Sequence, residues 1–218
     1  MSTKKKELIS DICKQVLGPI SEKEALFLYD LAKSIKNGVI VEIGAANGRS
    51  TVCLAKGSQA GYGIKIYSID PHIPDLYTSD PEWLTSCNTG ADGTPDEKYY
   101  TRQGTGHLEF YDNIKKFGVD DIVIPIQDYS EMAYKKGLGK EWDIPIGLLF
   151  IDADHRFNYV KKDFELWTKW VVRKGKVLMH DRQFPGVTRV INEMILNNSR
   201  YRKIKDIHDD PIFNCTVR

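Results

Sequence analysis

Residues 44–48 form a turn of small residues between an apolar run and a segment that can form a helix. Gly44, Ala46 and Gly48 carry small side chains or none, so a ligand can approach the backbone of this glycine turn closely. A turn at the start of a helix also presents backbone N–H groups to a nucleotide-like ligand, with Ser50 in the first helical turn. The sequence leaves open a tight strand-to-helix turn that binds nothing.

Two carboxylates narrow the choice of ligand. Asp70 ends the next predicted strand, 65–69, where a carboxylate can accept hydrogen bonds from both ribose hydroxyls, so an adenosine-bearing cofactor is expected. Glu42 lies beneath the turn, where an anionic side chain repels a pyrophosphate and attracts a cationic amine. A dinucleotide site would also normally show a second glycine at Ala46. A dinucleotide is therefore disfavoured.

Alternating strand and helix patterns must position these residues. Five strands are predicted, at 39–43, 65–69, 122–126, 146–151 and 176–179. Helices are predicted between and after them, at 50–56, 109–117, 129–136, 157–171 and 187–195. Strands separated by helices pair in parallel with right-handed crossovers. The last two predicted strands, 202–207 and 212–217, have no helix between them, so they add an antiparallel edge hairpin, 201–218. The expected fold class is α/β: a doubly wound, seven-stranded, mostly parallel Rossmann-like sheet with that hairpin at its C-terminal edge.

The remaining segments are N-terminal helices and one long insertion. Ser21 and Glu24 form a capping-box pattern that starts a helix, and Asn37-Gly38 ends it, within a helical segment 1–37. Residues 71–106 interrupt the alternation between a strand and its following helix. Because this segment leaves the carboxyl end of a strand, where open α/β sheets bind ligands, we expect a lid.

Length and charge limit the class of function. The 218 residues suit a single domain, 1–218, and the net charge of 31 − 30 = +1 gives no strong field for phosphate backbones or anionic lipid, so nucleic-acid binding is disfavoured. No apolar run approaches the ~20 residues of a membrane span, and no secretory signal is visible. The four cysteines lack a C-x-x-C pair and indicate reduced thiols in the cytoplasm. Apolar residues near the N-terminus could pack against a second copy in a homo-oligomer: Leu8, Ile12 and Val16.

Four sequence segments carry a family resemblance: Glu42-x-Gly44-x-Ala46-x-Gly48, Asp70, Gln127-Asp128-Tyr129-Ser130, and the run from Leu149 to His155. Together they resemble successive motifs of class I S-adenosylmethionine-dependent methyltransferases, over roughly residues 39–197. The resemblance implies that Asp70 holds the ribose and that Asp128 and Ser130 lie beside the adenine. It also implies that the glycine turn, with Glu42, faces the amino-acid part of the cofactor and that Asp152 borders the cofactor.

The second half of the chain is similar to a narrower group, the small-molecule O-methyltransferases of the catechol and macrolide-sugar type that bind a divalent cation. In that group, an aspartate after the fourth strand and polar residues after the fifth hold the metal. The resemblance thus assigns Asp152, His180 and Asp181 to the metal, and His155, three positions after Asp152, to the catalytic base. Carboxylate oxygens suit Mg²⁺, whereas an imidazole ligand suits Mn²⁺, Fe²⁺ or Zn²⁺.

The predicted reaction moves a methyl group from S-adenosylmethionine to a hydroxyl of a small molecule, with or without a divalent metal. In-line attack needs a hydroxyl held near the methyl group and a base to take its proton, and a free imidazole, with a pKa of ~6.5, can do so near neutral pH. Two alternatives stay open: an NAD-dependent oxidoreductase on a similar sheet, and a non-catalytic adenosine-binding domain in which His155 and Asp181 are idle.

Overall fold

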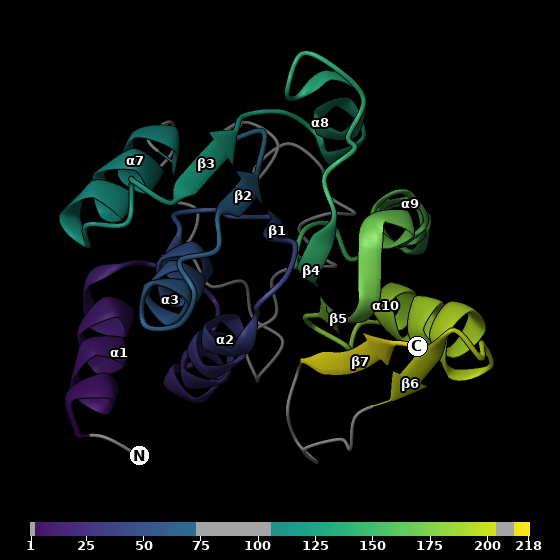
Figure 1. Ribbon diagram of the computed structural model, residues 1–218, viewed down its shortest axis with the longest axis horizontal. Helices are drawn as coiled ribbons and strands as arrows, with labels where there is room; N and C mark the ends of the chain where they lie inside the picture. Colours follow the sequence, from purple (N-terminus) through teal and green to yellow (C-terminus); the bar gives the residue numbers. More distant parts are fainter. Residues whose placement is uncertain (1–2, 73–105, 204–211) are drawn as a thin grey trace.

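A computed structural model of the chain describes residues 3–72, 106–203 and 212–218 (Figure 1). Its centre is a seven-stranded sheet with the strand order β3-β2-β1-β4-β5-β7-β6. The parallel part comprises β1 (Val39–Ile43), β2 (Ile66–Ile69), β3 (Val123–Ile126), β4 (Ile146–Ile151) and β5 (Val171–Met179). The strands β6 (Tyr201–Lys203) and β7 (Phe213–Val217) pair antiparallel with each other, and β7 pairs antiparallel with β5. The predicted fold class is confirmed.

Helices cover both faces of the sheet (Figure 1). One face carries α1 (Thr3–Gln15), α2 (Glu22–Ser34), α3 (Arg49–Gln59) and α7 (Gly106–Lys116). The other carries α8 (Ser130–Lys136), α9 (Phe157–Trp167), α10 (Pro185–Val190) and the π-helical segment Ile191–Leu196. Neighbouring strand residues alternate between the two apolar clusters, as the two-residue period of a strand requires: Leu148 packs in the first cluster and Leu149 in the second.

The fifth strand is longer than the pattern predicts. The spacing from Phe157 to Val171 predicts one helix, but α9 ends at Trp167 and a 3₁₀ turn, Thr168–Trp170, follows it. Val171 then opens β5 and pairs with Ile146. The assignment of Val171 to the helix is therefore wrong, because a β-branched residue at helical spacing gains more here from pairing with a buried strand.

The N-terminal helices form as predicted and use their apolar faces within the chain. The capping box of Ser21 and Glu24 is present, and α2 ends at Ser34, slightly before the predicted stop at Asn37-Gly38. Ile12 and Val16 are buried in the same cluster as residues of α2 and α3. This face therefore gives no reason to expect a second copy of the chain.

Two predictions fall largely on residues that the structure does not describe. The predicted lid, 71–106, extends through 73–105, and the predicted strand 202–207 extends past β6 into 204–211. In residues 73–105 and 204–211, these two predictions lie outside the described residues. No helix in the described ranges is long and apolar enough to cross a membrane.

Candidate active site

Four parallel strands end at the same level of the sheet. The register pairs Ile43 with Ile69 on one side and with Ile151 on the other, and Ile151 pairs with Met179. The next residue of each strand therefore leaves the sheet at one edge: Gly44, Asp70, Asp152 and His180. This alignment brings together the two halves of the site that the sequence predicts.

The glycine turn, residues 44–48, lies directly against the end of β4. Gly44 has a φ of +92°, and a β-carbon there would lie 2.1 Å from the carbonyl oxygen of Asp152. Gly48, with a φ of +87°, opens α3 beside the ring of Phe110. Ala46 also has a positive φ, +44°. Glycine is therefore required at position 44 for two reasons, backbone conformation and space.

Asp70 has a structural role that the sequence did not predict. Its Oδ2 accepts hydrogen bonds from the backbone N–H groups of Ala45 and Ala46, both at 2.9 Å, and its Oδ1 accepts one from His72 N at 2.7 Å. A carboxylate offers about four acceptor sites, so these bonds occupy most of them. Asp70 therefore holds the glycine turn in place, and its contact with a ribose stays a prediction.

Glu42 is fully buried under the turn. Its Oε2 accepts hydrogen bonds from the hydroxyls of Thr51, at 2.5 Å, and Ser68, at 2.8 Å. Burial raises the pKa of Glu42 to about 7, although neighbouring hydroxyls, including that of the buried Ser50, partly oppose the shift. Near neutral pH this carboxyl is thus divided between its two forms, and a cationic ligand above it would favour the charged one.

The two residues predicted to lie beside adenine have different hydrogen-bond partners. Asp128 follows β3 at the half-exposed edge, where its Oδ1 accepts a hydrogen bond from Tyr129 N at 2.9 Å. The hydroxyl of Ser130 instead accepts a hydrogen bond from Trp167 Nε1 of α9, at 2.8 Å. The contacts of both residues with an adenine therefore stay predictions.

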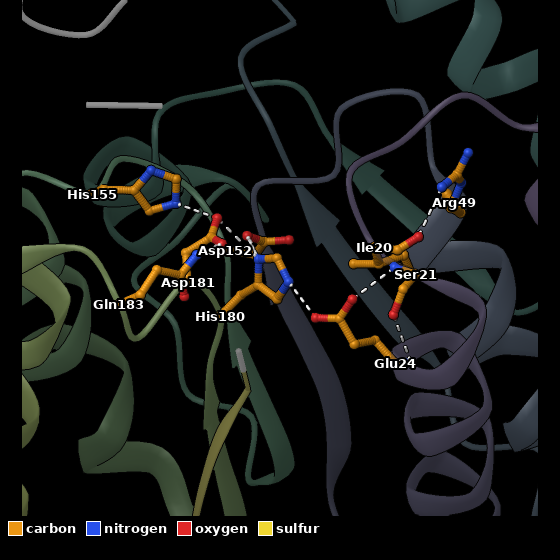
Figure 2. Close-up of polar contacts among 9 residues, drawn as sticks. All are labelled: Ile20, Ser21, Glu24, Arg49, Asp152, His155, His180, Asp181 and Gln183. Carbon is orange, nitrogen blue, oxygen red and sulfur yellow. Dashed lines mark hydrogen bonds and ion pairs between the residues drawn. The ribbon is translucent and has the colours of Figure 1, made fainter. Parts of the chain in front are cut away.

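Asp152 and Asp181, called here the acidic pair, meet His155 at this edge (Figure 2). One ligand atom from each of these three side chains lies within 4.8 Å of the others. His155 Nε2 is 3.0 Å from Asp181 Oδ2, and its ring stacks on Phe184 with 4.6 Å between centroids. Two contacts thus restrict the imidazole: the ion-pair contact at Nε2 and the stacking on its face.

Close packing and backbone strain also place this group. A β-carbon at Gly186 in α10 would lie 2.2 Å from His155 O, so this glycine lets α10 approach the segment after β4. Asp181 has a φ of +54°, a backbone conformation that is unfavourable for residues other than glycine. Its side chain is held by Gln183, whose Nε2 donates a hydrogen bond to Asp181 Oδ1 at 2.8 Å. Such strain is maintained only where the surroundings hold it.

His180 lies behind the acidic pair. Its Nδ1 is 2.9 Å from Asp152 Oδ1 and 3.1 Å from Asp181 Oδ2. Its Nε2 is 2.8 Å from Oε1 of Glu24, a residue of α2. Burial opposes the charged form, but the surrounding carboxylates outweigh it and raise the pKa of His180 well above 6.5.

The pKa values of the acidic pair shift in opposite directions. Burial raises the pKa of Asp152, with His180 partly opposing the shift. Burial would also raise the pKa of Asp181, but its hydrogen bonds to His155 and His180 and their charges hold it well below the usual value. Asp181 is therefore the firmly ionised member of the pair.

The acidic pair and His155 form a donor set that could hold a divalent cation, and the role of His180 as a metal ligand stays a prediction. The group of possible ligand atoms contains the acidic pair and His155, whereas His180 faces Glu24 with one of its nitrogens. Two carboxylates and an imidazole suit Mn²⁺, Fe²⁺ or Zn²⁺ better than Mg²⁺. No sequence pattern pointed to Glu24 as a site residue, because the capping box already accounted for its position.

A family comparison agrees with this arrangement. A family model described as a methyltransferase domain matches residues 41–182, well over half of the chain. The chain belongs to this methyltransferase family. The matched range begins within β1 and ends just after β5, so it contains the glycine turn, Asp70, the acidic pair and both histidines.

Solved structures share the fold of this methyltransferase. An O-methyltransferase from Bacillus cereus, in complex with SAH, is 17% identical with a TM-score of 0.64, covering 100% of this chain and 92% of that one. A putative caffeoyl-CoA O-methyltransferase from Staphylococcus aureus is 16% identical with a TM-score of 0.62, at 100% and 93% coverage. The O-methyltransferase TomG from Streptomyces achromogenes, in complex with SAM, is 14% identical with a TM-score of 0.59, at 100% and 90%. At these identities the likeness shows the fold.

One curated relative matches a shorter stretch of the methyltransferase. An uncharacterized protein of Acanthamoeba polyphaga mimivirus is 29% identical over 87 residues, which are 38% of this chain and 34% of that protein. The match thus spans about a third of the length of that relative.

Proposed function

We propose that this methyltransferase transfers the methyl group of S-adenosylmethionine to a hydroxyl of a small molecule. The observation that carries the proposal is the contact between the glycine turn and the end of β4, where Gly44 approaches the Asp152 carbonyl too closely for any other residue. This contact puts a nucleotide-type turn beside the acidic pair and His155. Two structural neighbours are O-methyltransferases solved with SAH or SAM, which supports the same donor and the same class of acceptor.

The proposed cofactor position follows from the order of the strands. The glycine turn faces the amino-acid part of the cofactor, with Glu42 beneath it, and Asp70 at the end of β2 faces the ribose. Asp128 after β3 faces the adenine, with Ser130 as a more distant contact because its hydroxyl is bonded to Trp167. Asp152 after β4 then lies on the methyl side.

His155 is the proposed base. The acceptor hydroxyl attacks the sulfonium methyl carbon in line, the bond from sulfur to methyl breaks, and the hydroxyl proton passes to the imidazole. Asp181, 3.0 Å from His155 Nε2, orients the ring and stabilises the imidazolium that forms. Stacking on Phe184 keeps the ring in the same plane during the transfer.

The acidic pair and His155 are also the residues that would hold a divalent cation. When bound, a cation supplies Lewis-acid polarisation, which lowers the pKa of the acceptor hydroxyl. His155 cannot use one nitrogen both to bind a cation and to take a proton. Chelation therefore separates the two routes: full turnover after dialysis against EDTA supports His155 as the base, and loss restored by Mn²⁺ supports the metal route.

Calorimetry and a transfer assay test the proposal. We expect the protein to bind SAH and not NAD, and to transfer radiolabel from S-[methyl-¹⁴C]adenosylmethionine to a panel of catechols and sugars. His155→Ala and Asp181→Ala should bind SAH and lose transfer. Binding of NAD but not of SAH would indicate an oxidoreductase. Transfer activity equal to that of the wild type in both variants would show that His155 and Asp181 take no part in the reaction.

We further propose that the protein acts in the cytoplasm on a small molecule rather than on nucleic acid. The net charge of +1 and the absence of disulfides among the described cysteines, Cys13, Cys53 and Cys215, support this view. The apolar face of α1, which was expected to pack against a second copy, is buried within the chain, so it no longer supports a homo-oligomer. Light scattering of the purified protein measures the oligomeric state directly.

A further inference from the structure

Glu24 has two separate tasks in the structure. As the third residue of α2 it completes the capping box, in which its Oε2 accepts a hydrogen bond from Ser21 N at 2.7 Å. Its other oxygen, Oε1, lies 2.8 Å from His180 Nε2. The carboxyl is buried, so neither contact is a surface ion pair. A helix cap alone does not need a buried carboxylate aimed at the end of β5.

The second contact leads directly to the acidic pair (Figure 2). The far ring nitrogen of His180, Nδ1, lies 2.9 Å from Asp152 Oδ1 and 3.1 Å from Asp181 Oδ2. One carboxylate from α2 and two from the ends of β4 and β5 therefore hold the two nitrogens of one ring. The close contact at Nε2 and the ion-pair contacts at Nδ1 restrict the movement of the ring, and the ring in turn restricts the oxygens that it contacts.

We propose that Glu24 is a positioning residue for methyl transfer. Its carboxylate fixes the ring of His180, and this ring holds the two oxygens of the acidic pair at the distances that His155 and the acceptor require. The inference rests on the proposed function and extends it to the N-terminal helices. Glu24 lies outside residues 41–182, the range that the family model matches.

Arg49 ties the same N-terminal segment to the glycine turn. Arg49 directly follows Gly48, and its guanidinium donates hydrogen bonds to three backbone carbonyls before α2: Cys13 at 3.0 Å, Val16 at 2.7 Å and Ile20 at 2.8 Å. The start of α2 is therefore fixed to the start of α3, next to the cofactor turn. Glu24 thus reaches His180 from a support that does not move independently of the site.

The alternative is that the contact between Glu24 and His180 only fastens α2 to the sheet. Glu24→Gln and Ser21→Ala separate the two explanations. Glutamine is accepted at the third position of a capping box, so Glu24→Gln keeps the cap, but its NH₂ group cannot accept the hydrogen bond from Nε2–H when its oxygen faces Ser21 N. Ser21→Ala removes the side-chain half of the cap and leaves the carboxylate on His180.

Each variant is measured in three ways: kcat and KM for methyl transfer, SAH affinity by calorimetry, and ¹⁵N spectra of the histidine rings. For Glu24→Gln we expect kcat to fall about 10- to 100-fold with SAH affinity unchanged, and the ring signals of both His180 and His155 to move. For Ser21→Ala we expect a lower midpoint of thermal unfolding, with kcat and the His155 signals of the wild type.

The inference is overturned if Glu24→Gln has the kcat and His155 signals of the wild type, or if Ser21→Ala loses as much kcat as Glu24→Gln. If Glu24→Gln does not fold, Glu24→Asp serves instead, because it keeps the charge and withdraws it from Nε2 by one methylene. A lower kcat with intact SAH binding supports the inference, and an unchanged kcat overturns it. An inactive wild type would refute the proposed function, while the His155 signals would still decide whether Glu24 acts on the site.

Discussion

Gly44 lies where the turn after β1 meets the end of β4. A β-carbon there would be 2.1 Å from the carbonyl oxygen of Asp152 and 2.6 Å from its carbonyl carbon, at a φ of +92°. The backbone strain of a non-glycine residue costs ~1–3 kcal/mol, and forced movement of the two segments costs ~1–3 kcal/mol more. We therefore expect Gly44→Ala to lower the free energy of unfolding by ~2–6 kcal/mol. The same movement should widen the cofactor turn.

Gly63 provides the matched control. It also has a positive φ, +65°, but a β-carbon there would meet nothing within 4 Å, so Gly63→Ala isolates the backbone contribution. Urea unfolding should show a loss of ~1–2 kcal/mol for Gly63→Ala, and calorimetry should show unchanged SAH affinity. Gly44→Ala should lose more stability and most of its SAH affinity. Equal losses of stability in the two variants, with SAH binding retained in both, would refute the close approach of the turn to β4.

Three further variants test other parts of the structure. His155→Gln should lower kcat by ~10²–10⁴ without weakening SAH binding, and turnover like that of the wild type would rule out the base role. Burial raises the pKa of Asp163 to about 7, so its contribution to stability is full below pH ~4 and is lost as the pH rises through about 7. In urea unfolding, the free energy of unfolding of the wild type should therefore fall more between pH 4 and pH 8 than that of Asp163→Asn, by up to about 4 kcal/mol. The same dependence on pH in both proteins would contradict this. Arg49→Ala removes three charged hydrogen bonds to carbonyls and should lower the unfolding free energy by several kcal/mol, ~1.5–3 for each bond. A loss of unfolding free energy below ~1 kcal/mol would show that the N-terminal segment does not depend on Arg49.

Local patterns in the sequence predicted most of the elements and their order. The strand 146–151 has the predicted bounds, and the capping box at Ser21 starts α2 as expected. These features depend on residues close together in the chain, and so the spacing of apolar and capping residues is sufficient to predict them. Val171 shows the limit of this approach, because its helical spacing was overridden by pairing with Ile146, which is a contact between distant strands.

The sequence by itself determined that the glycine turn, Asp70, Asp152 and Asp181 leave one edge of the sheet, because parallel strands in register end together. Only the tertiary structure decided which partners these side chains take. Asp70 bonds to the backbone of the turn, and His155 joins the acidic pair in the possible ligand group. Period and chain order fix the edge from which a side chain leaves, but the pairing of a buried charge depends on the helices that pack behind it. For His180 that partner is Glu24, which is 156 residues away in the sequence.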